Sequence, residues 1–112
     1  PDEIVMCGPA PVVIPYVDPG LPLARAIKQG IDRFIDTYGE LPKVIMLQNH
    51  GLVALAETAQ QVENITAMAV KAARILVGTY ALGGPRFLPP TVIDRIHTRP
   101  DEHYRQRIIG KK

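Results

Sequence analysis

Two apolar segments separated by a very short polar link constrain this chain more than any other feature. Residues 43–48 and residues 51–56 are largely aliphatic, and only Asn49 and His50 lie between them. A link of two residues is typical of a β-hairpin. The residue types agree, because Asn and Gly tolerate the positive φ that tight turns require. Both segments are apolar at successive positions. We therefore expect both faces of the hairpin to be covered and the hairpin to lie centrally in a layered fold.

Two long helices are predicted on either side of this hairpin. Apolar residues recur at three- and four-residue spacing over residues 22–38, which indicates one apolar helical face. Gly30 interrupts that helix at a cost of roughly 1 kcal/mol relative to alanine, a choice that close packing would explain. A second helix is predicted from Thr58, which can cap the first turn while Gln61 reaches back, to about Val77.

Shorter elements complete the expected fold. Residues 3–7 predict a strand, residues 12–14 an edge strand or extended crossover between prolines, and residues 90–97 and 101–109 two short helices separated by Pro100. The whole pattern predicts an α/β fold, a layered α/β/α sandwich with a largely antiparallel central sheet. A helical tail follows it.

Composition excludes several classes of protein. Hydrophobic residues make up 46% of the 112 residues and charged residues 21%, which is ordinary globular composition. No apolar stretch approaches the roughly 20 residues of a membrane span, so no membrane partner is expected. The only cysteine, Cys7, excludes an intrachain disulfide and favours a cytoplasmic protein with a buried thiol.

The charge distribution is uneven but gives little indication of a partner. The net charge of +2 is too small to imply nucleic acid. Residues 81–112 hold seven basic side chains against three acidic ones. A solvated helix face is the simpler interpretation, because the acidic residues are interleaved; contact with an acidic partner, a phosphate or nucleic acid is the alternative.

His50 is the residue best placed to carry chemistry. It would lie at the tip of a tight turn between two strands, which fixes the backbone and leaves the ring nitrogens accessible. Such a histidine can serve as a metal ligand or general acid/base, but histidines in turns are also often simply solvated.

The sequence around His50 resembles a signature of the class II aldolase/adducin family. The resemblance rests on Val-Ile-Met-Leu-Gln-Asn-His-Gly-Leu-Val-Ala-Leu-Ala at residues 44–56 and on Gln-Gln-Val-Glu-Asn-Ile at residues 60–65. Upstream, Val-Ile-Pro-Tyr at residues 13–16 resembles the segment before the family's next helix. The similarity is continuous over residues 3–80, and we expect residues 1–80 to be the C-terminal half of the family domain. Residues 81–112 match only loosely and form the expected helical tail.

The resemblance implies a metal-dependent lyase. Family enzymes hold a divalent ion, usually zinc, through three histidines, and the one in the Asn-His-Gly turn corresponds to His50. The ion polarises the carbonyl of a small phosphorylated ketose and stabilises the enediolate left by carbon–carbon cleavage. The resemblance also implies a homotetramer with sites at subunit interfaces. Epimerases, dehydratases and the non-catalytic adducin-type assembly module share the fold and remain alternatives.

The chain departs from the family pattern in its other histidines. It lacks the family's His-x-His element, so the site is expected to be incomplete without an N-terminal half. His97 and His103 are six residues apart, a step that turns about 600° along a helix, so one continuous helix would not bring them together. Pro100 between them disfavours one continuous helix. The resemblance suggests Tyr104, rather than Tyr80, as a C-terminal tyrosine assisting proton transfer; an aromatic anchor with an exposed hydroxyl is the alternative.

Overall fold

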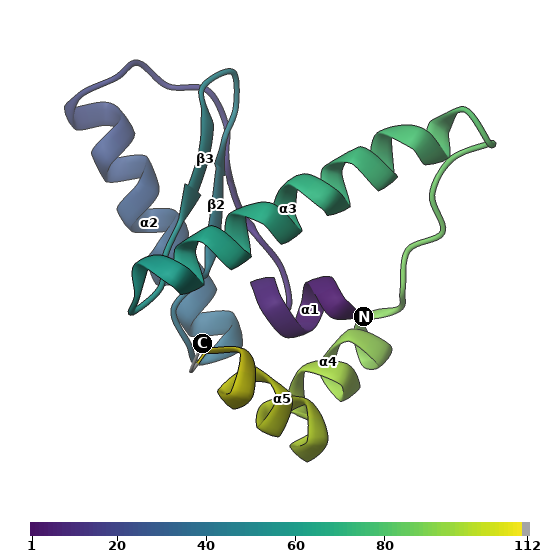
Figure 1. Ribbon diagram of the computed structural model, residues 1–112. Helices are drawn as coiled ribbons and strands as arrows, with labels where there is room; N and C mark the ends of the chain where they lie inside the picture. The colour runs from purple at the N-terminus through teal and green to yellow at the C-terminus, as the bar shows by residue number, and fades with distance from the viewer. Residues whose placement is uncertain (111–112) are drawn as a thin grey trace. The chain divides into compact units, whose positions relative to one another are not determined.

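The chain folds into two compact units, and the computed structural model describes residues 1–110. One unit joins Pro1–Pro9 to the chain from Ala56 onward, and the other is Ala10–Leu55. Figure 1 labels all of the elements except β1. The elements are α1 (Asp2–Cys7), β1 (Val12–Ile14), α2 (Leu21–Tyr38), β2 (Val44–Leu47), β3 (Gly51–Ala54), α3 (Ala59–Tyr80), α4 (Pro90–Thr98) and α5 (Pro100–Gly110). The protein is thus a small mixed α/β structure.

The three strands of Ala10–Leu55 form one sheet in the order β1-β2-β3. β1 runs parallel to β2, with Val12 opposite Ile45, and β3 runs antiparallel to β2, with Leu47 opposite Gly51. The prediction of a largely antiparallel sheet was therefore too simple. A parallel pair needs a long crossover, and α2 supplies it between β1 and β2.

One face of this sheet is covered by α2. The core of this unit is a cluster of buried apolar side chains from β1, β2 and α2: Val12, Ile14, Phe34, Ile45 and Leu47. Gly30 lets the helix approach closely, because a Cβ there would lie 2.6 Å from Cδ1 of Ile14 and 2.9 Å from Cγ1 of Val12. Close packing is therefore the physical reason for this helical glycine.

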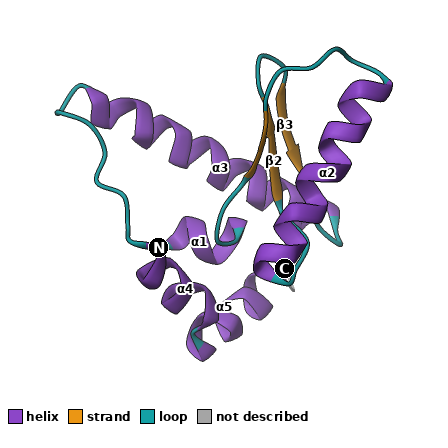
Figure 2. Ribbon diagram, turned by 180° about the vertical axis from the view of Figure 1, so that it is seen from behind, coloured by secondary structure: helices purple, strands orange, loops and turns teal. Residues whose placement is uncertain are grey.

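The hairpin was predicted correctly, and the covering of both its faces in a layered fold stays a prediction. β3 is an edge strand within residues 1–110, and Leu52 and Val53 are 37% and 36% exposed. Figure 2 shows β2 and β3 as adjacent strands. Apolar residues on both faces of a strand favour burial of those faces, but they do not place a further strand at its outer edge.

The N-terminal segment is a helix and not the predicted strand. Asp2 and Glu3 lie in the first turn of α1, where the helix dipole favours negative charge. Val5 and Cys7 are buried, and the Cys7 thiol donates a long hydrogen bond of 3.7 Å to the carbonyl oxygen of Ile65 in α3. Packing against α3 thus outweighs the β-propensity of a short aliphatic segment, and the predicted burial of the thiol is confirmed.

The predicted capping box at the start of α3 is present in a slightly shifted form. The Thr58 hydroxyl accepts a hydrogen bond of 3.2 Å from the backbone N–H of Gln61. The Gln61 side chain accepts one of 3.2 Å from the N–H of Glu57, one residue before the expected partner. Two of the N–H groups near the helix start are satisfied in this way.

The two C-terminal helices form as predicted and belong to the same compact unit as α1 and α3. α4 and α5 meet at Arg99 and Pro100, and the Arg99 guanidinium forms an ion pair with Asp101 at this corner. α1 packs against α3, α4 and α5, so the tail contacts the body of the protein. The proposed boundary between residues 1–80 and 81–112 stays a prediction. No helix within the described residues has the length and apolar character needed to span a membrane.

Candidate functional site

The turn between β2 and β3 presents His50 at the surface. The backbone N–H of His50 donates a 3.1 Å hydrogen bond to the carbonyl of Leu47, which closes the turn. Asn49 has a φ of 58°, which lies in the left-handed region. Tight turns often need this backbone conformation, and Gly and Asn adopt it most readily. The His50 side chain is exposed. The sequence therefore places an accessible imidazole on a defined backbone, as predicted.

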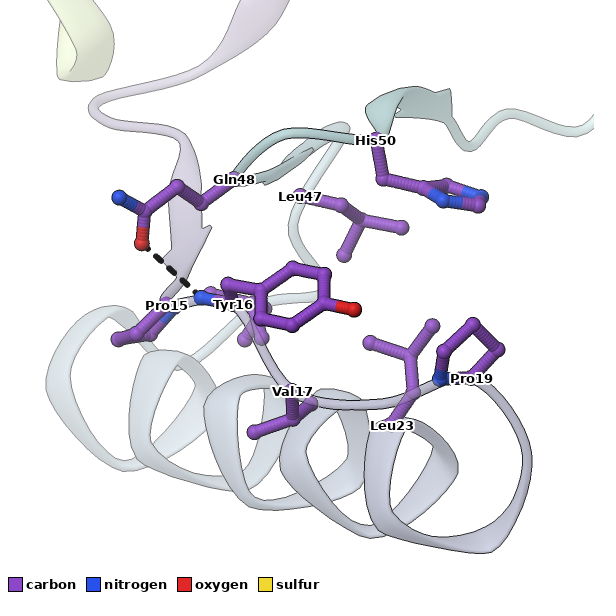
Figure 3. A pocket seen from close by; sticks show the side chains of 9 residues that line it. Pro15, Tyr16, Val17, Pro19, Leu23, Leu47, Gln48 and His50 are labelled. Atoms are coloured by element: carbon purple, nitrogen blue, oxygen red, sulfur yellow. Dashed lines mark hydrogen bonds between the residues drawn. The ribbon is translucent and has the colours of Figure 1, made fainter.

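Gln48 ties this turn to the loop that follows β1. Its N–H donates a 3.0 Å hydrogen bond to the carbonyl of Ile14, and its side-chain oxygen accepts one of 2.9 Å from the N–H of Tyr16. The second bond is drawn in Figure 3. These bonds extend the parallel pairing of β1 and β2 beyond the last strand residues. The Tyr16 loop and the His50 turn are consequently held as neighbours.

A shallow apolar hollow lies between this turn and the start of α2 (Figure 3). It encloses about 240 Å³, including space open to solvent. It is lined by Ile14, Pro15, Tyr16, Val17, Pro19, Leu23, Leu47, Gln48 and His50. The enclosed part measures only about 10 Å³, roughly the space of one water molecule, so the hollow is an open apolar depression and not a ligand-sized pocket.

The polar groups at the hollow are few and differ in their roles. The Tyr16 hydroxyl donates a 3.3 Å hydrogen bond to the Asp18 carboxylate within the same loop. The Gln48 side chain is engaged with the backbone of Tyr16. His50 is thus the group at this rim best suited to bind a metal or exchange a proton.

The donors needed to complete a metal site do not gather around His50. No three His, Cys, Asp or Glu side chains within residues 1–110 lie close enough to hold an ion together. A structural or catalytic zinc site in a protein normally takes three or four such ligands. The single imidazole therefore fits a metal site only as one of several ligands, with the others supplied from outside these residues.

His97 and His103 lie near one another at the corner between α4 and α5. Their ring centres lie 6.5 Å apart, with the ring planes inclined at 55°. One continuous helix would have held the two rings apart, but the helix breaks at Pro100, as predicted, and the chain turns between α4 and α5. That corner brings the end of one helix beside the start of the next.

The suggested catalytic tyrosine lies on α5, in the compact unit that does not contain His50. Tyr104 is 62% exposed, and Tyr80, at the end of α3, is 66% exposed. Exposure agrees with an aromatic residue whose hydroxyl faces solvent and equally with one that serves a neighbouring subunit. The catalytic role of Tyr104 stays a prediction.

Comparisons with family models, with curated proteins and with solved structures gave no match. The functional argument therefore depends on the residues themselves. The hydrogen bond between Gln48 and Tyr16 is the feature of the site that was not predicted from the sequence. A polar amide directly after an aliphatic strand was the available signal, because such a side chain often satisfies a backbone group of a neighbouring segment.

Replacement of Asn49 tests the turn geometry. Asn49→Ala should lower the free energy of unfolding by about 1 kcal/mol, because a Cβ without a compensating polar group is disfavoured at positive φ. Asn49→Gly should leave it unchanged or slightly raised. Urea titrations followed by circular dichroism give both values. Equal losses in the two variants would show that the left-handed backbone is not what the asparagine provides.

Proposed function

We propose that this chain supplies one ligand, His50, to the divalent-metal site of a lyase of the class II aldolase type. The substrate class is a small phosphorylated ketose, and the reaction is retro-aldol cleavage. Zinc is the first candidate ion, since three imidazoles with an open position suit it. The observation that carries the proposal is an exposed imidazole at the apex of a braced hairpin turn.

Three features of the turn support this assignment. The strands on both sides fix the backbone, the left-handed Asn49 sets the direction of the chain, and Gln48 joins the turn to the Tyr16 loop. A ligand held on a rigid element loses little entropy when it binds an ion. The apolar hollow beside His50 would exclude water from one side of a bound substrate.

The proposal makes a definite demand on the rest of the site. Two further imidazoles have to come from polypeptide outside the described residues, either in the same chain or in a neighbouring subunit. Once bound, the metal supplies Lewis-acid polarisation of the substrate carbonyl. The role of this chain is to hold one coordination position and to form one apolar wall. A cytoplasmic homo-oligomer, tetrameric by the resemblance, is the form in which we expect the complete site.

The proposal is tested with His50→Ala in the intact native protein. Metal content per chain, measured by elemental analysis after dialysis, should fall sharply, with the apparent metal affinity reduced roughly 100-fold or more, a larger loss than outer-sphere substitutions cause. Aldol cleavage of phosphorylated pentuloses and hexuloses should be lost in parallel. His103→Ala is the matched control, because it removes an exposed imidazole from another part of the chain.

The result that would contradict the proposal is unchanged zinc stoichiometry in His50→Ala. Intact metal binding with epimerised or dehydrated products, and no cleavage, would assign the same site to one of the related reactions instead.

A non-catalytic assembly role is the second candidate, and one observation favours it. Large apolar side chains are exposed along the C-terminal half of α3 and the segment after it, including Val77, Leu82 and Phe87 at 72%, 89% and 77%. Surfaces of this kind commonly mark protein–protein contacts. A native protein that assembles but retains no metal would support this role over the lyase.

A further inference from the structure

The exposed face of α3 carries a regular pattern that the metal site does not use. One side of the helix packs in its own unit, where Ile65 and Ala69 are buried and Cys7 of α1 bonds to the carbonyl of Ile65. The opposite side has exposed residues at alternating spacings of three and four. This stripe consists of Gln60, Glu63, Ala67, Val70, Arg74 and Val77. Such spacing aligns the side chains along one line of the helix. Three members of the line are apolar (Ala67, Val70 and Val77), and Glu63 and Arg74 carry opposite charges on either side of its centre.

We propose that this stripe, the α3 stripe, is an interface with the α3 stripe of a second copy of the chain, and that the two helices pack antiparallel about a twofold axis. This inference does not depend on the lyase proposal. A twofold interface brings the same patch of both copies together, so the patch has to be complementary to itself. The α3 stripe meets that condition in one alignment.

The alignment follows from the charges. Glu63 lies near the start of the helix and Arg74 eleven residues later, about 16 Å along the axis. With the axis passing between Ala67 and Val70, Glu63 of each copy faces Arg74 of the other, and Ala67 faces Val70. The same axis places Gln60 opposite Val77. A parallel alignment in register would instead bring Glu63 onto Glu63 and Arg74 onto Arg74, which like-charge repulsion disfavours.

The packing at the centre of the stripe suits close approach of two helices. Ala67 is small and Val70 is 42% exposed, so the middle layer is apolar without a bulky side chain. Neither Glu63 nor Arg74 forms an ion pair within residues 1–110, so both charges are available to a partner. Val77, at 72% exposed, would cover the first turn of the partner helix.

Charge reversal tests whether a second copy of the chain binds the α3 stripe and whether the two α3 helices pack antiparallel. The native protein should sediment as a dimer, or as a multiple of two chains, in analytical ultracentrifugation. Glu63→Arg should raise the dissociation constant of the dimer at least about ten-fold, because the twofold axis turns two attractive pairs into two repulsive ones. Arg74→Glu should do the same. The double variant Glu63→Arg/Arg74→Glu should return to within about three-fold of the native value.

Two controls keep the outcome interpretable. Lys28→Glu makes a charge reversal of the same size at an exposed position of α2 and should leave the dissociation constant unchanged. Circular dichroism checks folding, and restoration by the double variant excludes misfolding as the cause of dissociation. A monomeric native protein at about 100 µM would overturn the proposal, since even a weak specific dimer forms at that concentration. A dimer insensitive to the single reversals, or a double variant that stays dissociated, would overturn it as well.

Discussion

Ile45→Ala should lower the free energy of unfolding by about 2–5 kcal/mol and leave unit Ala10–Leu55 largely unfolded at 37 °C. Ile45 lies on the central strand β2, opposite Val12 on one side and Val53 on the other, and is 2% exposed. Truncation removes three buried carbon atoms and leaves a cavity among the core side chains. The loss is comparable to the whole stability of a small domain.

Urea denaturation followed by circular dichroism measures this loss, and Val13→Ala is its control. Val13 is also a β-branched strand residue, but it is 63% exposed on the face of β1 that α2 does not cover. Its truncation should change the free energy of unfolding by no more than about 0.5 kcal/mol. Similar losses in the two variants would contradict the assignment of the core to the α2 side of the sheet.

Gly30→Leu should destabilise the same unit by about 3 kcal/mol or more. The new Cβ alone would lie 2.6 Å from Cδ1 of Ile14 and 2.9 Å from Cγ1 of Val12, two side chains buried in the core. The helix would have to shift away from β1 and uncover the core. Leucine gains roughly 1 kcal/mol over glycine in helix propensity, which the packing loss exceeds.

Gly78 provides the matched control for this prediction. It also lies within a helix, near the end of α3, and a Cβ there would meet nothing within 4 Å. Gly78→Leu should therefore raise the free energy of unfolding by up to about 1 kcal/mol, through helix propensity and a less flexible unfolded chain. Opposite signs at the two positions are the expected result of thermal unfolding. The same sign at both would show that propensity, and not contact with β1, governs Gly30.

The elements with strong local signals could be predicted from the sequence. The apolar periodicity of residues 22–38 located α2 to within one residue, and Thr58 with Gln61 located the start of α3. Prolines marked both C-terminal helices. These signals are local because caps, breaks and an amphipathic face depend on residues within a few positions of one another.

The features that were wrong depend on contacts between distant residues. α1 owes its helical form to α3, which follows 58 residues later at the Cys7–Ile65 bond. The parallel pairing of β1 with β2 is a property of the assembled sheet.

The candidate site also combines local features that could be predicted from the sequence with contacts between distant residues that could not. The exposed position of His50 and the left-handed backbone beside it follow from a short turn containing Asn. The bond from Tyr16 to Gln48 spans 32 residues and required the parallel pairing of β1 with β2, which was not foreseen. Its role as a brace therefore emerged only from the structure.

The discontinuous unit built from Pro1–Pro9 and the chain after Ala56 has a consequence for the order of folding. During synthesis α1 emerges before α3, and it finds this partner only after the intervening strands, α2 and the first half of α3 have been made. The hairpin unit is continuous in sequence, so it closes its contacts over shorter loops and at lower entropic cost. Synthesis from the N-terminus should thus complete unit Ala10–Leu55 before the unit that contains α1, and α1 should stay unpaired until α3 has been made.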